Sequence, residues 1–294
     1  MKFNSLGPHN FCGVKSNFEK SKAIVIPVPY DSTASYRAGT REGPNAIISS
    51  SRQLELFDLE LDKNIFDEVG IYTLDELEPN VDSPRKNCDN VRNAVEYVVE
   101  NNKLPIVLGG DHSITFGSVE AVKKKFQNVS ILHFDAHSDL RDEFDGSKYS
   151  HACVMRRVSE LGVKIVQVGI RSTEEECQDY IAKNKDKFKV FPAHEKAKWK
   201  TKDILAGLTD EVYISFDVDC LDPSIMPATG TPVPGGLLWA DVVEILREVS
   251  AKKKIIACDF VELMPLPGFH APDFLVANLV YKTIGYALLT GQKT

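Results

Sequence analysis

Short apolar runs of strand length alternate along this chain with stretches whose apolar residues recur at helical spacing. The runs are almost continuously hydrophobic, which is typical of strands that are covered on both faces, as in a parallel sheet. We predict strands at residues 23–27, 105–108, 129–134, 164–168, 211–216 and 255–261. Parallel neighbours need a crossover connection, usually a helix, so the alternation favours an α/β fold over an all-α or all-β fold.

Three segments carry signals for the crossover helices. Ser83 followed by Pro84 is typical of a helix start, and it leads into valines at helical spacing. We also predict helices at residues 240–251 and 271–289. The order of elements predicts one domain, residues 1–294, with a three-layer α/β/α architecture. Ligands of such sheets bind beyond the carboxyl ends of the strands, and the functional residues are expected there.

Composition excludes several classes of protein. The chain has 294 residues, of which 43% are hydrophobic and 26% are charged, so it is expected to fold rather than to be disordered. Its formal charge of −7 argues against nucleic acid or an anionic membrane as a partner. No apolar run is long enough to span a membrane, no signal-peptide core is present, and none of the six cysteines forms a CxxC pair. We therefore expect a cytoplasmic protein with reduced thiols.

Ionisable residues follow two of the predicted strands. The strand at 105–108 leads into Gly109 and Gly110, which allow a close approach of the backbone, and then Asp111 and His112. A single histidine in such a place is more often structural than a ligand. The strand at 129–134 runs into Asp135, His137 and Asp139, which alternate and would project to one side if the strand continued. We predict that the side chain of His133 points away from Asp135 and lies in the core or behind the site.

A third strand end adds two more carboxylates. The strand at 211–216 is followed by Asp217 and Asp219, again two residues apart. Cys220 is expected to point to the opposite face, so we exclude it as a ligand. Asp222 precedes a proline and is expected to brace a turn.

The three strand ends together offer two imidazoles and four carboxylates. Such a set exceeds what one tetrahedral zinc needs, and it suits two cations that share carboxylates. Four negative charges match two divalent cations. Mainly oxygen ligands, with two histidines and no thiolate, favour Mn²⁺ or a similar ion. The predicted ligands are His112, Asp135, His137, Asp139, Asp217 and Asp219.

These motifs resemble the signatures of a known family. GGDH, DAHSD and SFDVDCLDP, in this order, are similar to those of the ureohydrolase superfamily, which includes arginases and agmatinases. The resemblance extends from the segment at residues 36–44 to that at 259–262. It implies a doubly wound, mainly parallel eight-stranded sheet, and it implies that the six predicted ligands hold two Mn²⁺ ions per chain. It also implies a homo-oligomer, a trimer or a hexamer.

The resemblance also implies a hydrolysis of guanidines that releases urea. A pair of metal ions can lower the pKa of water and supply hydroxide, which Asp139 would hold. His151 lies where the family carries a histidine that gives a proton to the leaving amine, although a purely structural role at a helix start is its alternative. Glu262 resembles the family glutamate that binds the substrate guanidinium, with a structural ion pair as its alternative.

Substrate choice depends on the loop at residues 140–149. The loop is acidic on balance and resembles that of agmatinases, and acidic residues suit the dication agmatine, a small cationic guanidine. Arg141 could pair with Asp142 or Glu143, or it could bind a substrate carboxylate. The segment at 269–273 departs from the family pattern and leaves the far wall of the pocket open. We therefore predict an agmatinase, which would form putrescine for polyamine biosynthesis.

Other functions remain as alternatives to agmatine hydrolysis. Within the family they are hydrolysis of aminopropylagmatine, guanidinobutyrate, arginine or formiminoglutamate. From other classes they are a single-zinc deacetylase and a metal-binding protein without turnover.

Overall fold

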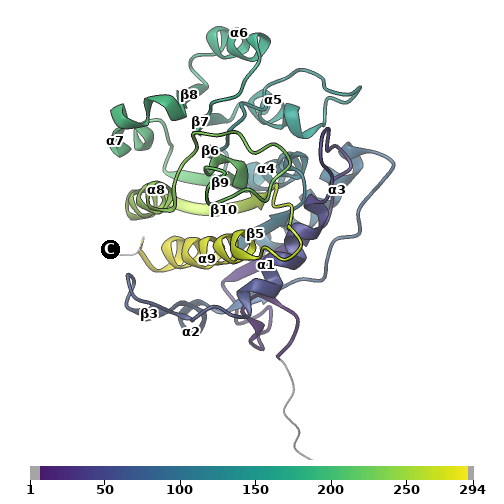
Figure 1. Ribbon diagram of the computed structural model, residues 1–294. Helices are drawn as coiled ribbons and strands as arrows, with labels where there is room; N and C mark the ends of the chain where they lie inside the picture. The colour runs from purple at the N-terminus through teal and green to yellow at the C-terminus, as the bar shows by residue number, and fades with distance from the viewer. Residues whose placement is uncertain (1–6, 291–294) are drawn as a thin grey trace, which may run out of the picture.

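Eight strands form one parallel sheet at the centre of the computed structural model, which describes residues 7–290 (Figure 1). The strand order is β4-β1-β5-β10-β9-β6-β7-β8, and every pair of neighbours in it is parallel. The strands are β1 (Ala23–Val28), β4 (Ile71–Thr73), β5 (Leu104–Gly109), β6 (Val129–Phe134), β7 (Lys164–Val168), β8 (Phe188–Phe191), β9 (Glu211–Asp217) and β10 (Lys254–Val261). The predicted doubly wound, eight-stranded sheet is confirmed.

The strand order brings the sequence motifs together. After β5 the chain crosses to the other half of the sheet for β6, β7 and β8, and it then returns to place β9 and β10 between β6 and β5. The four central strands β5, β10, β9 and β6 are therefore neighbours, and each of the three predicted metal motifs follows one of them. Because parallel strands end at the same edge of a sheet, these motifs meet.

Helices cover both faces of the sheet. One apolar core joins the sheet to α1 (Gly43–Ser51), α2 (Ile65–Val69), α7 (Thr201–Leu205), α8 (Trp239–Lys252) and α9 (Ala271–Gly285). The other core joins it to α3 (Pro84–Glu100), α4 (Thr115–Lys125), α5 (Val154–Glu160) and α6 (Glu175–Lys183). Figure 1 shows α8 and α9 across one face. The predicted three-layer architecture is thus confirmed.

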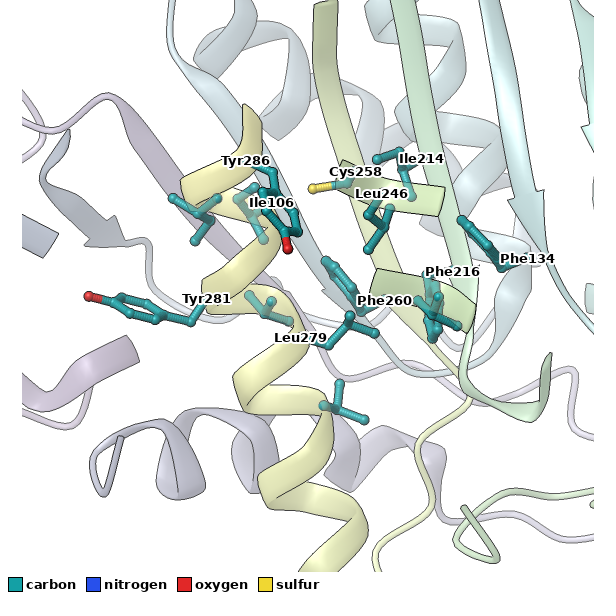
Figure 2. Close-up of a cluster of buried hydrophobic side chains, with 14 of the residues drawn as sticks. Ile106, Phe134, Ile214, Phe216, Leu246, Cys258, Phe260, Leu279, Tyr281 and Tyr286 are labelled. Atoms are coloured by element: carbon teal, nitrogen blue, oxygen red, sulfur yellow. The ribbon is translucent and has the colours of Figure 1, made fainter. Parts of the chain in front are cut away.

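Alternating side chains of the strands serve the two cores. Phe134, Phe216 and Phe260 point from β6, β9 and β10 into the core under α8 and α9, where Leu279 and Tyr286 meet them (Figure 2). The intervening residues of these strands pack against the opposite helices. Both faces of the sheet are buried, which explains why the strands are apolar throughout.

The sequence prediction missed elements at the edges of the sheet. The outer strands β4 and β8 are three and four residues long, so they give little periodic signal. A small antiparallel pair, β2 (Phe57–Asp58) and β3 (Lys63–Asn64), was also missed. The helix predicted at 271–289 ends at Gly285 and continues as a π-helical turn, Tyr286–Thr290. Ser83 precedes α3 as predicted, but its side chain makes no capping hydrogen bond.

The sheet collects strands from residue 23 to residue 261, and a single domain remains our prediction for the chain. Residues 1–6, to which the signal-peptide prediction applies, and residues 291–294 lie outside the described residues. Between residues 7 and 290, none of the helices is both long and apolar enough to cross a membrane.

Candidate metal centre and cleft

The ends of β5, β6 and β9 bring the predicted ligands to one place at the edge of the sheet. His112 begins a short 3-10 helix after β5, Asp217 is the last residue of β9, and Asp219 lies in the 3-10 helix that follows. Gly110 makes the first of these turns possible, because a Cβ atom there would lie 1.9 Å from the carbonyl oxygen of Tyr30. The predicted close backbone approach is confirmed at Gly110, whereas a Cβ atom at Gly109 would lie 2.7 Å from a side-chain carbon of Val261.

His112 lies at the centre of a first group of ligand atoms. Its Nδ1 atom is 3.2 Å from a carboxylate oxygen of each of Asp135, Asp139 and Asp217. This buried nitrogen nevertheless has no hydrogen-bond partner. One imidazole nitrogen and three carboxylate oxygens thus converge without the geometry of hydrogen bonds, which is the arrangement expected around a cation.

A second group of ligand atoms adjoins the first. Nδ1 of His137 lies 2.9 Å from Oδ2 of Asp219 and 3.6 Å from Oδ1 of Asp135. Asp135 belongs to both groups. Ligand atoms of His112, Asp135, Asp139 and the neighbouring His133 lie within 4.8 Å of one another, as do those of Asp135, His137 and Asp219. The structure therefore brings all six predicted ligands together, in two clusters that share one carboxylate.

The backbone route to this arrangement differs from the predicted one. Strand β6 ends at Phe134, so the predicted alternation of residues 135–139 does not occur. Asp139 instead has φ of 52°, in the left-handed region that non-glycine residues seldom adopt. Turns, rather than a continued strand, direct the three side chains toward the site.

His133 contacts the site, contrary to the predicted direction of its side chain. Residues i and i+2 of a strand share a face, and Nε2 of His133 lies 2.8 Å from Oδ2 of Asp135. The amide of Gln167 donates to the carbonyl of Ser138 and lies 3.0 Å from Nδ1 of His133. With Nδ1 as the acceptor, Nε2 carries the hydrogen and donates to Asp135. His133 thus orients a predicted ligand from behind, as the alternative prediction had it.

A second buried group supports His112. Nε2 of His112 lies 2.8 Å from Oγ of Ser215, and that hydroxyl donates to Oδ1 of Asp259 at 2.9 Å. Because serine has one hydrogen, its oxygen accepts from Nε2–H of His112, and Nδ1 keeps the lone pair that a metal requires. The sequence prediction missed Asp259, although a single carboxylate inside an otherwise apolar run is a signal that could have found it.

The electrostatics of the cluster favour added positive charge. Burial alone would lower the pKa of His112, but the neighbouring carboxylates, Asp135 first among them, raise it well above its ordinary value. Burial also works against the charged form of His137, yet Asp219 and Asp135 raise its pKa to about 12. Burial and the charges of Asp219 and Asp135 raise the pKa of Asp217 well above the ordinary range. The raised pKa values show that the clustered negative charges favour bound protons, and a divalent cation would compensate the same negative charge.

The donor set fits two divalent cations. The orphaned Nδ1 atom of His112 and the converging oxygens around it are what a metal ion would satisfy. Neither ligand group of residues 7–290 includes a cysteine, so the exclusion of Cys220 agrees with the structure. Carboxylate oxygens with two imidazoles suit hard to borderline ions.

Glu262 follows β10 and lies beside the metal motifs. Its Oε1 atom accepts a hydrogen bond of 2.7 Å from the backbone N–H of His112. Burial, together with the charge of Asp111, raises the pKa of its carboxyl group well above the ordinary range. Its φ of 65° is left-handed, like that of Asp139. In the described residues no arginine forms an ion pair with it, so the structural alternative for Glu262 receives no support.

A cleft of about 180 Å³ opens above these residues. Its floor and walls include six of the predicted site residues: His137, Asp139, His151, Asp217, Asp219 and Glu262. His112 and Asp135 are fully buried and do not line it. His151 and Glu262, which are predicted to act on the substrate and not to bind metal, thus share one cleft with the predicted metal ligands.

The mouth of the cleft differs from the predicted acidic loop. Asp142 pairs with Arg157 at 2.7 Å and does not line the cleft. Arg141 pairs with neither Asp142 nor Glu143, but with Glu174 from another loop, at 2.5 Å. Both Arg141 and Glu174 line the cleft, so its outer negative charge comes from Glu174 and not from the loop at 140–149.

Two further predictions concern loops near the site. Asp222 accepts hydrogen bonds from the backbone N–H groups of Ser224, Gly235 and Gly236, which confirms that it braces a turn. The segment at 269–273 does not line this cleft; His270 and Asp273 line a separate, open one beside α1 and α9. That segment therefore does not form the far wall of the site.

Comparisons with known proteins agree with the geometry. A sequence model of the arginase family matches residues 21–285. The chain is 40% identical over 270 residues to the N(1)-aminopropylagmatine ureohydrolase of Thermus thermophilus, covering 91% of each chain. It is 37% identical over 295 residues to the enzyme of that name from Synechocystis, covering 97% of this chain and 95% of the other. The crystal structure of the agmatine ureohydrolase of Thermoplasma volcanium superposes with a TM-score of 0.86 at 31% identity, covering 96% and 94% of the two chains.

Proposed function

The chain belongs to the arginase family, whose members are hydrolases of guanidino compounds, and we propose that it hydrolyses agmatine or its N1-aminopropyl derivative to urea and an amine. The observation that carries the proposal is the pair of ligand clusters that share Asp135 in the cleft lined by Glu262 and His151. A deacetylase with a single zinc needs no such pair, and the family match favours the ureohydrolase.

The proposed cofactors are two Mn²⁺ ions. His112, Asp135, Asp139 and Asp217 would hold one ion, and Asp135, His137 and Asp219 would hold the other. Once bound, two divalent cations would lower the pKa of nearby water and so supply hydroxide at neutral pH.

The residues of the cleft have distinct proposed roles. Glu262 binds the guanidinium of the substrate, because a planar fork of N–H donors matches a carboxylate. Asp139 holds the nucleophile through a carboxylate oxygen. His151 gives a proton to the nitrogen that leaves, because that nitrogen needs the proton to depart as a neutral amine. The oxygen of water adds to the guanidino carbon, the bond between this carbon and the alkyl-substituted nitrogen breaks, and urea and the amine are released.

Two observations support a substrate whose far end is an amine. Glu174 supplies a carboxylate at the mouth of the cleft, where an ammonium group can replace the exposed guanidinium of Arg141. The relatives from Thermus thermophilus and Synechocystis are named for N(1)-aminopropylagmatine, and the superposed structure is named for agmatine. Both substrates carry a guanidinium and at least one amine, and they differ in length.

A substrate panel tests the proposal. Urea release would be measured with Mn²⁺-loaded protein on agmatine, N1-aminopropylagmatine, arginine and 4-guanidinobutyrate, and formamide release on formiminoglutamate. Bound metal would be counted per chain. We expect kcat/KM to be highest for one of the two amine-ended guanidines, and two metal ions per chain. Higher kcat/KM for a substrate with a carboxylate would refute the substrate proposal, and no turnover of any of them would refute the enzyme proposal.

Assembly as a trimer or a hexamer stays a prediction. Sedimentation velocity of the purified chain tests it, and a monomer at micromolar concentration would contradict it.

A further inference from the structure

Thr33 lies in the loop after β1, far in sequence from the metal motifs, yet it contacts His151. Its Oγ1 atom is 3.2 Å from Nδ1 of His151, and it accepts the backbone N–H of the same residue at 3.1 Å. On its other side, the hydroxyl of Thr33 donates to Oδ2 of Asp111 at 2.8 Å. Thr33 thus connects the fully buried Asp111 to the proposed proton donor.

The direction of these hydrogen bonds follows from counting hydrogens. Asp111 accepts from the backbone N–H and the hydroxyl of Thr33, and also from the backbone N–H and the hydroxyl of Ser113. The hydroxyl of Thr33 has one hydrogen, and Asp111 receives it. Toward His151 the oxygen of Thr33 is therefore an acceptor, and Nδ1 of the ring must carry a hydrogen. Without that hydrogen, two lone pairs would face each other at 3.2 Å.

One other polar atom is near the same nitrogen. Oγ of Ser150 lies 3.4 Å from Nδ1 of His151, and its hydroxyl hydrogen is free to turn either way. The contact is longer than that of Thr33 and makes no further link to a charged group. Phe144 packs against the imidazole ring of His151 and limits its rotation. The two rings meet edge to face, with their centroids 5.9 Å apart.

We infer that Thr33 is a positioning residue, which holds the His151 ring in the cleft with a hydrogen on Nδ1 and leaves Nε2 for the substrate. The inference rests on the proposed role of His151. When a doubly protonated ring gives its Nε2 hydrogen to the leaving nitrogen, the neutral ring that remains has its hydrogen on Nδ1. Thr33 accepts from this form, so its hydroxyl stabilises the ring that the proton transfer produces.

The variants Thr33→Val and Thr33→Ser test the inference in the metal-loaded enzyme. Valine has the shape of threonine but lacks the hydroxyl, and we expect kcat to fall about 10–100-fold, as for other groups that orient a functional side chain. KM is expected to change by less than about threefold, because Thr33 acts on the proton transfer and not on guanidinium binding. Serine is expected to restore kcat to within about threefold of the parent value.

A matched control separates this role from a structural one. The hydroxyl of Thr33 also accepts a backbone N–H at the start of the 3-10 helix His151–Cys153, so its loss would lower the thermal midpoint in either case. Ser150→Ala removes the other hydroxyl near Nδ1 and is expected to leave kcat almost unchanged. Equal losses in Thr33→Val and Ser150→Ala, or no rescue by serine, would overturn the inference. Thr33→Ala carries the same expectations if the valine variant does not fold.

Neutron diffraction gives a readout that is independent of turnover. At a pH about two units above the ordinary pKa of imidazole, we expect deuterium on Nδ1 of His151 and the deuterium of the Thr33 hydroxyl directed to Asp111. Deuterium on Nε2 alone would overturn the inference even in an active enzyme. If the parent protein hydrolyses none of the guanidines, the proposed function fails, while the neutron result still decides whether Thr33 sets the form of the ring.

Discussion

The hydrogen-bonded series His112–Ser215–Asp259 makes a quantitative prediction about metal affinity. Ser215→Ala removes the oxygen that accepts from Nε2 of His112 at 2.8 Å, and it leaves that N–H without a partner in a fully buried place. The His112 ring then lacks the hydrogen bond that fixes its orientation and keeps the hydrogen on Nε2, so that Nδ1 faces the carboxylates. Removal of such a partner of a metal ligand costs about 10–100-fold in affinity, which corresponds to about 1.4–2.7 kcal/mol.

The measurement is a competition titration of Mn²⁺ against a chromophoric chelator. Two sites are expected in the parent protein, and the affinity of the site that includes His112 should fall in Ser215→Ala. The free energy of unfolding of the metal-free protein should also fall, by about 1–3 kcal/mol, because a buried donor is left unpaired. Stability loss alone therefore does not identify the role of Ser215.

Thr115→Val is the matched control. The hydroxyl of Thr115 donates to Oδ2 of Asp259 at 2.8 Å, and the residue is as buried as Ser215. Its backbone N–H donates to the carbonyl of His112, which the substitution keeps, but its hydroxyl makes no hydrogen bond to the His112 ring. We expect a similar loss of stability and no loss of Mn²⁺ affinity beyond about threefold. The reasoning is refuted if Ser215→Ala binds both ions as tightly as the parent protein, or if the control loses as much affinity.

Three further outcomes are expected. Glu262→Gln keeps the acceptor for the N–H of His112 but removes the charge, so KM for the guanidine should rise at least about tenfold, in line with about 1.5–3 kcal/mol for a charged hydrogen bond; an unchanged KM would contradict the role of Glu262. Gly110→Ala places a Cβ atom 1.9 Å from a carbonyl oxygen and should destabilise the fold by about 1–3 kcal/mol or more in urea titrations, against a cost near zero if the loop can move. Burial raises the pKa of Asp58, but the ammonium of Lys282, which lies 2.8 Å away, outweighs it and holds that pKa below its ordinary value. This pair should therefore stabilise the fold above about pH 4 and lose its effect as the pH falls further, so Lys282→Met should flatten the acid side of the pH–stability curve; parallel curves for both proteins would argue against it.

The centre of the sheet and the ligand set could be predicted because their signals are local. Strands β5, β6, β9 and β10 are apolar runs that are buried on both faces, and each motif directly follows its strand. Strands β4 and β8 escaped prediction because they are short and lie at the edges, where the pattern is mixed. Whether a strand could be predicted thus depended on its position in the sheet, which the local sequence does not encode.

The contacts that tune the site join distant segments and could not be read from either partner. Arg141 pairs with Glu174, which lies 33 positions away in the sequence. Asp142, in the loop predicted to bring acidic residues to the cleft, pairs with Arg157 and does not line the cleft. Thr33 contacts His151, which lies 118 positions away in the sequence, and neither residue lies within a strand whose pattern could have predicted the contact. Residue types predicted the chemistry of the centre, whereas partner choice around it depends on which loops the strand order brings together.

Backbone strain links the fold to the chemistry of the cleft. Asp139 and Glu262 both have left-handed backbones, which cost about 1–3 kcal/mol each for residues other than glycine. Fixed hydrogen bonds hold them: the carbonyl of Asp139 accepts from the N–H groups of Met155 and Arg156, and the N–H of Glu262 donates to the carbonyl of Gly110. Glycine would suit both backbones better, but it would remove the carboxylate. The surrounding hydrogen bonds thus maintain an unfavourable backbone that directs two carboxylates into one cleft. Folding stability does not explain this arrangement, because it costs free energy, whereas binding of a positively charged ligand explains it.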